Sequence, residues 1–403
     1  MAERVEGPGR AVAVTSLGAV TAFGAGVEAF WRGALDGRSG IAPVTRFSAD
    51  PYRSGVAAEI PAGSLVREMD ELATGASPAT CLAFAAAREA LKGGRVPGAP
   101  ERLGVVVGTS MGGNGAFVDW VRNGAVPAVR RSEATLFSVA SDLARAIGAR
   151  GPTLGVSVAC ASGTLAVGIG ADMIRRGECD AVLAGGFDVL SEFVFAGFDS
   201  LRALSPSAAR PFDRRRDGLT LGEGAAFLLL EKASRVEEQR RVPLAIVRGY
   251  GSAADAHHMT RPSPSGEGLV RAVTAALSDA SIVPEEIGFV STHGTGTVFN
   301  DRMEAAAFRT LFGERADRLP MNSIKGAVGH TLGAAGAIEA LLCTLVLGRG
   351  EIPPTAGFEE PDPQCPLDVV AASPRPLPVS VRYVLSTSSA FAGTNAALVF
   401  ERP

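Results

Sequence analysis

The chain has 403 residues, of which 46% are hydrophobic, and a formal net charge of −3 at pH 7. This length exceeds one ordinary hydrophobic core and indicates two domains or a duplicated unit. The slightly negative charge excludes nucleic acid as a bulk partner, and the absence of a long uninterrupted apolar segment predicts no signal peptide and no membrane span.

The first part of the chain alternates predicted strands and helices. We expect strands over 11–15, 103–107, 180–186, 225–230 and 244–249, and helices over 27–35, 76–92, 133–147 and 165–176. The charged segment 210–218 is interpreted as a loop held by Arg–Asp ion pairs rather than as a site for an acidic polymer.

The second part repeats this alternation. We expect strands over 287–292, 321–325, 381–386 and 396–400, and helices over 267–278, 302–311 and 332–347. Strands that alternate with helices indicate an α/β fold with largely parallel central strands.

Cysteine usage bounds the chemistry. Five cysteines, at positions 81, 160, 179, 343 and 365, form no C-x-x-C pair and leave an odd one over. The pattern favours a reducing cytoplasm over a disulfide framework or a zinc site. We therefore expect a cytoplasmic protein without a bound metal.

Cys160 stands out among the five. A short β-branched run containing Val156 and Val158 stops at this cysteine, and a Gly/Ala-rich helical stretch follows. A helix N-terminus carries partial positive charge and free N–H groups, which lower a thiol's pKa and can stabilise a nearby oxyanion. The pattern predicts a nucleophile at a sharp turn, with a buried structural cysteine as the alternative.

A weak internal repeat connects this cysteine with a histidine. The segment 162–165 resembles 329–332, and each follows a strand and opens a Gly/Ala-rich helix. In a duplicated fold the two helix starts would meet, which would bring Cys160 and His330 into one pocket. His293 also follows a strand that ends in glycines, a usual position for functional groups in α/β folds. A metal site is the competing interpretation, but no carboxylate lies at metal-ligand spacing.

Four segments together resemble the β-ketoacyl-ACP synthases. They are V-A-C-A-S-G at 158–163, H-G-T-G-T at 293–297, S-I-K-G-A-V-G-H at 323–330 and F-A-G-T-N at 391–395. The resemblance covers nearly the whole chain, in order. It implies a thiolase-like fold of two similar halves in five layers, αβαβα, with the nucleophile in residues 1–245 and the two histidines in residues 246–403.

The resemblance also implies a reaction. Cys160 would take an acyl group from an acyl carrier protein (ACP), and His293 and His330 would stabilise the enolate formed when malonyl-ACP loses CO₂. The N–H groups of Cys160 and Phe391 would hold the oxyanion of the condensation. The product is a 3-oxoacyl-ACP, and no cofactor is needed beyond the phosphopantetheine of the carrier.

Further residues receive roles only through the resemblance. Lys325 is expected to pair with Glu339 and to hold His330, while Glu304 and Asp301 support His293. The implied substrate-binding residues are Thr295, Thr297, Met111, Phe198 and Asn395. The implied carrier-protein docking residues are Arg202, Arg130 and Arg131.

The chain departs from the family pattern at two places. Ala390 and Ala392 flank Phe391, where glycines are usual, and Val298 and Asn300 replace the usual proline and glycine. Alanine restricts the backbone more than glycine does. We therefore expect the Phe391 loop to move less freely than in the family.

The sequence predicts a β-ketoacyl-ACP synthase of fatty acid or type II polyketide synthesis, including polyene synthesis. It would act as a homodimer, or as a heterodimer with a chain-length-factor-like subunit. One alternative is a non-elongating acyltransferase or a CoA-dependent thiolase on the same fold, which His293, His330 and Lys325 disfavour. The other is a non-catalytic partner subunit, which Cys160 disfavours.

Overall fold

The computed structural model of the protein describes residues 11–65, 77–92, 98–124 and 135–403. Through these residues runs one sheet in the order β11-β10-β14-β15-β9-β1-β8-β7-β5-β6, with β2 paired to β1. Its first-half strands are β1 (Val12–Thr21), β5 (Leu103–Gly108), β6 (Thr153–Val156), β7 (Ala181–Asp188) and β8 (Gly224–Lys232). Its second-half strands are β9 (Ala245–Ala254), β10 (Ile287–Ser291), β11 (Met321–Asn322), β14 (Tyr383–Ser389) and β15 (Thr394–Glu401).

The two halves of the sheet have the same topology. In the first half the strands lie in the order β6-β5-β7-β8-β1, which is the third, second, fourth, fifth and first strand along the chain. In the second half the order β11-β10-β14-β15-β9 is again third, second, fourth, fifth and first. The two first strands, β1 and β9, pair with each other through Val12–Val247, Ala13–Ile246 and Val14–Ala245. The sheet is therefore a duplicated unit joined at the β1–β9 seam, while the domain boundary between residues 245 and 246 stays a prediction.

Strand directions repeat as well, and they correct one expectation. β5 runs parallel to β6 and β7, as β10 does to β11 and β14. All the pairings between these groups, from β7 through β8, β1, β9 and β15 to β14, are antiparallel. The expected largely parallel centre was wrong. The four-residue connection between β14 and β15, for example, is too short for the crossover that parallel neighbours need.

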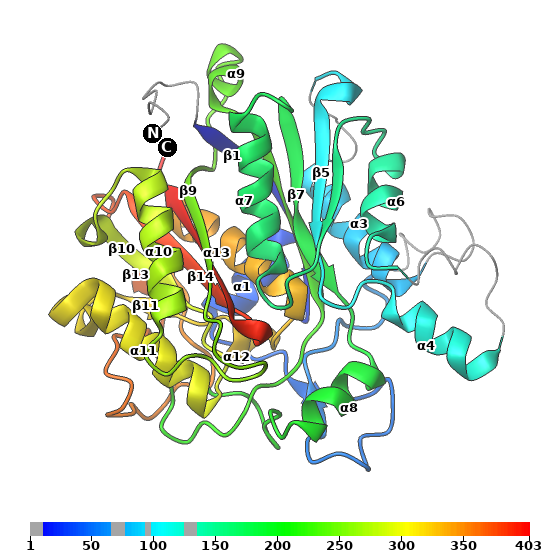
Figure 1. Cartoon of the computed structure of the whole chain (residues 1–403), viewed down its shortest axis with the longest axis vertical. Helices are drawn as coiled ribbons and strands as arrows, with labels where there is room; N and C mark the ends of the chain where they lie inside the picture. Colours follow the sequence, from blue (N-terminus) through cyan, green and yellow to red (C-terminus); the bar gives the residue numbers. More distant parts are fainter. Residues whose placement is uncertain (1–10, 66–76, 93–97, 125–134) are drawn as a thin grey trace.

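Helices cover both faces of each half and produce five layers (Figure 1). The middle layer is α7 (Ser162–Arg175) and α13 (Ala335–Arg349), packed on each other and on the inner faces of the sheet. The outer layers contain α3 (Pro78–Ala90) and α6 (Ser138–Ala146) on one side, and α10 (Glu267–Ala280) and α11 (Val298–Phe312) on the other. The remaining helices are α1 (Val27–Leu35), α4 (Asn114–Asn123), α8 (Glu192–Ser200), α9 (Ala233–Glu238) and α12 (Lys325–Val328).

The two central helices approach each other closely because their first turns contain glycine. A Cβ at Gly163 would lie 2.6 Å from the backbone nitrogen of Ala337, and one at Gly336 would lie 2.0 Å from the hydroxyl of Thr164. The start of α7 and the start of α13 therefore meet, as the internal repeat predicts. The segment Leu332–Arg349 is apolar and long enough to cross a bilayer, but it is mostly buried inside the protein as this core helix.

Several predicted elements differ in length from the observed ones, and two of them show the reason. β1 runs on to Thr21 because it pairs along its length with β8, and α3 packs so closely on it that a Cβ at Gly18 would lie 1.9 Å from the carbonyl oxygen of Ala86. The strand expected over 321–325 ends at Asn322, whose amide donates to the carbonyls of Pro353 and Pro354, and Lys325 begins α12.

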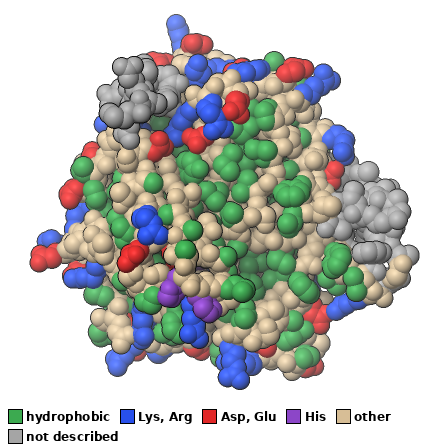
Figure 2. Space-filling model, in the orientation of Figure 1, with side chains coloured by type: hydrophobic (Ala, Val, Ile, Leu, Met, Phe, Trp, Pro, Cys, Tyr) green, Lys and Arg blue, Asp and Glu red, His purple; other side chains and the backbone are tan. Residues whose placement is uncertain are grey.

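Apolar side chains also gather on one part of the surface. Figure 2 shows hydrophobic side chains over the middle of the face that α7 occupies in Figure 1. At the neighbouring edge strand β6, Leu154 is exposed, and so is Phe137, whose ring lies against Gly155 of that strand.

Candidate active site

Cys160 lies in a tight turn between β6 and α7. The preceding residue, Ala159, has a φ of 49°, a left-handed conformation that alanine seldom adopts. The hydroxyl of Ser162 holds the turn, since it accepts from the N–H of Val158 at 2.9 Å and donates to the carbonyl of Ala159 at 2.6 Å. The thiol is buried.

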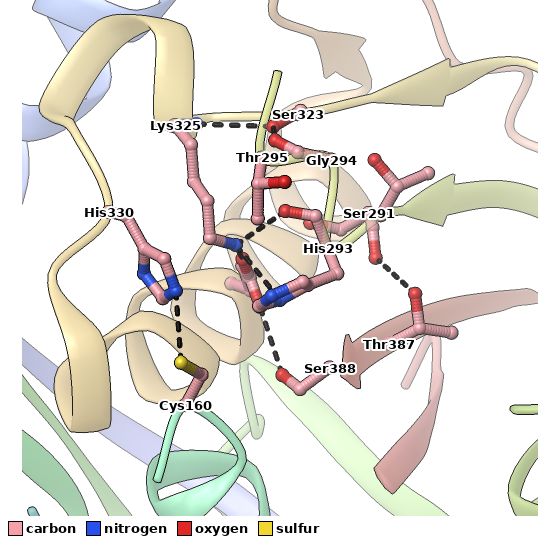
Figure 3. A network of polar contacts seen from close by, with 12 residues as sticks. Cys160, Ser291, His293, Gly294, Thr295, Ser323, Lys325, His330, Thr387 and Ser388 are labelled. Atoms are coloured by element: carbon pink, nitrogen blue, oxygen red, sulfur yellow. Dashed lines mark hydrogen bonds and ion pairs between the residues drawn. The ribbon is translucent and has the colours of Figure 1, made fainter. Parts of the chain in front are cut away.

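His330 contacts the thiol directly. Its Nε2 lies 3.1 Å from Sγ of Cys160 (Figure 3). Its Nδ1 accepts a hydrogen bond from the N–H of Leu332 at 3.2 Å, so the neutral ring carries its proton on Nε2. The His330 backbone is fixed by hydrogen bonds with Thr220 and Gly222.

His293 lies on the other side of the same space. The two imidazole rings have centroids 5.2 Å apart and stand nearly perpendicular, at 85°. Lys325 Nζ lies 3.3 Å from Nδ1 of His293 and 2.6 Å from its carbonyl oxygen (Figure 3). An ammonium only donates, so Nδ1 accepts, and the ring proton of His293 is also on Nε2.

Lys325 is buried and paired as predicted, but its contact with histidine differs from the prediction. Its ammonium forms an ion pair with Glu339, whose other carboxylate oxygen accepts from Ser388 at 3.2 Å. The prediction that Lys325 holds His330 was wrong in detail, because its hydrogen bonds go to His293. The reason is that Lys325 follows β11 closely, and β11 pairs with β10, the strand that leads to His293.

Two carboxylates on α11 fix the segment that carries His293. Glu304 accepts the N–H groups of His293 at 2.8 Å and Gly294 at 2.6 Å. Asp301 accepts the N–H of Thr295 at 3.1 Å. The amide of Asn300 donates to both, at 2.8 Å to Glu304 and 3.2 Å to Asp301.

Burial keeps both histidines neutral. Desolvation lowers the pKa of His293 and of His330 well below 6.5, and the charge of Lys325 lowers both further. Each ring therefore presents an Nε2–H donor at neutral pH, without a positive charge. Such donors can stabilise an enolate or another developing anion.

The thiol departs from the expected acidity. Burial raises the pKa of Cys160 to about 12, although Lys325 and the N–H groups of Phe391 and Cys160 act in the opposite direction. The predicted lowering of the thiol pKa was therefore wrong, because loss of solvation in the enclosed site destabilises the thiolate more than the start of the helix stabilises it. The two N–H groups directed at the sulfur are those expected to hold an oxyanion.

A cavity of about 550 Å³ connects Cys160, His293 and His330 with the surface. Of the predicted substrate and docking residues, it is lined by Thr295, Thr297, Phe198 and Arg202. Met111 does not line it and packs instead in the apolar cluster around Phe195. Asn395 does not line it either, because its amide is bonded to Ser389 and Asp255. Arg130 and Arg131 lie outside the described residues.

Comparisons with known proteins agree with this geometry. The family model for the β-ketoacyl synthase N-terminal domain matches residues 9–235, and the model for the C-terminal domain matches residues 244–359. The chain belongs to the β-ketoacyl synthase family. Its enzyme class is therefore that of the acyltransferases called ketosynthases.

Individual relatives match nearly the whole length of this ketosynthase. It is 40% identical to the tetracenomycin polyketide synthase ketoacyl synthase alpha subunit of Streptomyces glaucescens, over 97% of each chain. It is 35% identical to the 3-oxoacyl-[acyl-carrier-protein] synthase 2 of Staphylococcus aureus, over 97% of this chain and 98% of that one. The solved structure of the ishigamide ketosynthase/chain length factor superposes with a TM-score of 0.91 at 35% identity, over 98% and 99% of the chains. The thiolase-like α/β fold of two similar halves is thereby confirmed.

The Phe391 loop of the ketosynthase closes one side of the cavity. The ring of Phe391 stacks on Phe198, with centroids 5.5 Å apart and an angle of 22°. Ala392 has a φ of 63°, and its N–H donates to the carbonyl of Met259 at 2.7 Å. Alanine is disfavoured in this left-handed region, so Ala392 strains the observed loop conformation, and the expected restriction of loop movement stays a prediction.

The ketosynthase site also resembles a metal-ligand set. Sγ of Cys160 and ring nitrogens of His293 and His330 all lie within 4.8 Å of one another, and zinc accepts such donors. The ammonium of Lys325 behind His293 opposes a second cation there, because histidine ligands usually have an acceptor on their other nitrogen. The metal-free site stays a prediction.

Sequence reasoning missed two buried residues that brace the ketosynthase site. Asp188, at the end of β7, accepts the N–H groups of Ser110, Met111 and Gly333, and so ties the glycine-rich turn after β5 to the start of the second central helix. Ser388 bonds both Thr164 and Glu339. The only signal for either residue was a polar side chain at the end of an apolar strand.

Proposed function

We propose that this chain is the condensing subunit of a type II polyketide synthase. It takes an acyl group from an ACP onto Cys160, extends it with malonyl-ACP, and releases CO₂ and a 3-oxoacyl-ACP. The observation that carries the proposal is the convergence of Cys160, His293 and His330 on one cavity. The higher identity with a polyketide synthase alpha subunit than with the fatty acid enzyme favours the polyketide pathway.

In the first step Cys160 becomes acylated. Its sulfur attacks the thioester carbonyl of the acyl-ACP, the new carbon–sulfur bond forms, and the bond to the pantetheine sulfur breaks. The thiol proton leaves with the pantetheine thiol, so the step needs no further reactant. The N–H groups of Cys160 and Phe391 support this step, because donors directed at the sulfur lie beside the position of the tetrahedral oxyanion.

In the second step malonyl-ACP loses CO₂. Its thioester carbonyl accepts hydrogen bonds from Nε2–H of His293 and His330, and the electrons of the broken carbon–carboxylate bond form an enolate. Neutral imidazoles suit this task, since both donors strengthen as negative charge develops on the oxygen. The low pKa of both rings supports the assignment.

In the third step the enolate carbon attacks the acyl group on Cys160. A carbon–carbon bond forms, the carbon–sulfur bond breaks, and the 3-oxoacyl-ACP leaves. The thiolate of Cys160 takes a proton from solvent and returns to the resting thiol. Lys325 acts here as a positioning residue, because it keeps Nδ1 of His293 an acceptor and Nε2 a donor.

A second subunit of the chain-length-factor kind belongs to the proposal. This chain is similar over nearly its whole length to the solved structure of the ishigamide ketosynthase/chain length factor. In the described part of the chain no strand pairs with the outer edge of β6, and Phe137 and Leu154 are exposed beside it, which supports an apolar contact with that subunit. We also propose a cytoplasmic location, as for other carrier-protein-dependent synthases.

The test is a mass measurement on the purified chain, with and without a co-expressed partner subunit. Acyl-ACP should add one acyl group to the wild-type chain and none to Cys160→Ala. Malonyl-ACP should then release CO₂ and yield a 3-oxoacyl-ACP two carbons longer. Acylation without CO₂ release or elongation would support a non-elongating acyltransferase, and no acylation at all would support a non-catalytic subunit.

A further inference from the structure

The mouth of the cavity contains side chains to which the reaction gives no role. His258 and Arg261, in the segment between β9 and α10, line it together with Phe299 on the first turn of α11. All three are exposed, and Phe299 is 61% accessible. Exposing a large aromatic ring to solvent is unfavourable, so the position of Phe299 at the cavity entrance suggests a role in binding.

Arg261 packs on this exposed ring. Its guanidinium carbon lies over the ring of Phe299, 5.5 Å from the ring centroid, in a cation–π contact. Within the described part of the chain, no carboxylate forms an ion pair with Arg261. Among these described residues, Asp217 is the one acidic residue that lines the cavity, and its carboxylate accepts a hydrogen bond from Ser205 at 2.6 Å. The arginine is thus oriented by an apolar ring and keeps its hydrogen-bond donors for another anion.

His258 adds a second donor beside it. Its Nδ1 accepts the N–H groups of Thr260 at 3.1 Å and Arg261 at 3.2 Å. The proton of the neutral ring therefore lies on Nε2, and the ring cannot turn without losing both bonds. In Figure 2 the exposed histidine side chains lie beside a basic side chain on the surface.

We propose that Arg261 and His258 bind the phosphate of the phosphopantetheine arm at the cavity mouth, with Phe299 as the platform that positions Arg261. This inference rests on the proposed function, which supplies the arm. The arm ends in the thioester that reaches Cys160 and begins at a phosphate, so that the phosphate stays near the entrance. Thr295 and Thr297 line the same cavity and contribute hydroxyls along the way. A guanidinium fork matches phosphate oxygens in a bidentate way.

The test compares two small thioesters, acyl-pantetheine and acyl-4′-phosphopantetheine, which differ only in the phosphate. Acylation of Cys160 is followed by intact mass on the full chain. The wild-type chain should react about 5- to 10-fold more efficiently with the phosphorylated thioester, as expected for a hydrogen-bonded charge at an exposed site. Arg261→Gln should abolish this preference, so that the two thioesters react at equal rates, and Phe299→Ala should reduce the preference. Arg302→Gln, an exposed arginine of α11 that does not line the cavity, should keep it.

A second measurement reads binding without turnover. Free 4′-phosphopantetheine should protect Cys160 from alkylation by iodoacetamide better than pantetheine does, and this difference should disappear in Arg261→Gln. An Arg261→Gln chain that keeps the phosphate preference would overturn the proposal. So would a chain impaired only with acyl-ACP, since Arg261 would then contact carboxylates of the carrier protein. If 4′-phosphopantetheine protects Cys160 better than pantetheine but no thioester acylates the chain, the proposed function would be contradicted while the phosphate site would still be supported.

Discussion

The ammonium of Lys325 lies 3.3 Å from Nδ1 of His293 and donates to the carbonyl oxygen of the same residue at 2.6 Å. One buried charge thus fixes the tautomer of the ring, orients its backbone and lowers the pKa of both imidazoles. Glu339 balances that charge from α13. The catalytic geometry and the stability of the core therefore share one ion pair.

Removing one partner of this pair should destabilise the fold. Lys325→Met leaves the Glu339 carboxylate buried without a counter-charge, which typically costs about 3–5 kcal/mol of unfolding free energy. The double variant Lys325→Met/Glu339→Leu should recover most of that loss without recovering malonyl-ACP decarboxylation. Urea unfolding and CO₂ release measure the two effects. A double variant as unstable as Lys325→Met alone would contradict this account.

The two histidines should matter mainly for decarboxylation. His293→Ala and His330→Ala each remove one Nε2–H donor, and the loss of one such donor lowers the rate by about 100- to 1,000-fold. Acylation of Cys160 should survive His293→Ala. His257→Ala is the matched control, because this exposed histidine does not line the cavity. Unchanged CO₂ release in either catalytic variant would remove that ring from the mechanism.

Alkylation of Cys160 should depend steeply on pH. Burial raises the pKa of this thiol to about 12, so the thiolate fraction is small at neutral pH and rises as pH increases. The rate with iodoacetamide should increase about tenfold per pH unit from pH 7 to pH 9, since the thiolate is the nucleophile. Mass-spectrometric labelling, with Cys160→Ala as control, follows this rate. A plateau near pH 7 would mean that the surrounding donors outweigh burial.

Glycine at position 392 should slow the opening of the Phe391 loop. Ala392 holds a φ of 63°, and glycine there should relieve about 1 kcal/mol of strain in the observed, closed conformation. Ala392→Gly should therefore acylate Cys160 more slowly, with the largest effect for long acyl chains. Ala390→Gly is the comparison, since Ala390 has an ordinary extended backbone. Faster acylation in Ala392→Gly would support the opposite view, that alanine restrains the gate.

Asn300 should act as a positioning residue with a pH signature. Burial and the nearby Asp301 raise the pKa of Glu304 to about 8, and Asn300 donates to both carboxylates. Without this donor the pKa of Glu304 rises further, so the carboxylate that accepts the His293 N–H is lost at higher pH. Decarboxylation by the wild type should increase through about pH 8 as Glu304 ionises, and this increase should move to higher pH in Asn300→Gly and further still in Asn300→Asp. A decrease independent of pH would indicate a merely structural role.

Much of the fold and of the reactive centre is predictable from local sequence. The helix Val27–Leu35 was predicted with its observed ends, and Cys160, His293 and His330 were placed together from glycine-rich strand ends and an internal repeat. These features depend on short-range patterns that periodicity and glycine reveal. Recognition of the family rested on the same segments.

Three other features depend on packing between distant segments. The antiparallel centre follows from how the two halves join, which no single strand reveals. The acidity of Cys160 depends on enclosure by residues from both halves, and burial outweighed the helix start that the sequence suggested. Met111 and Asn395 matched substrate positions by motif, but neither lines the cavity. Met111 packs in the apolar cluster that contains Phe195, and the amide of Asn395 donates to Asp255.

The repeated strand order places the catalytic chamber at the joint between two copies of one topological unit. Each copy supplies five strands to the shared sheet, yet one contributes the sulfur and the other the imidazoles. A slip of one residue along the β1–β9 seam would displace the two contributions by about 3.3 Å, more than any hydrogen bond tolerates. Two strands that contribute no residue to the cavity, β1 and β9, therefore set the alignment of the catalytic groups. The two topologically equivalent halves supply different parts of one active site.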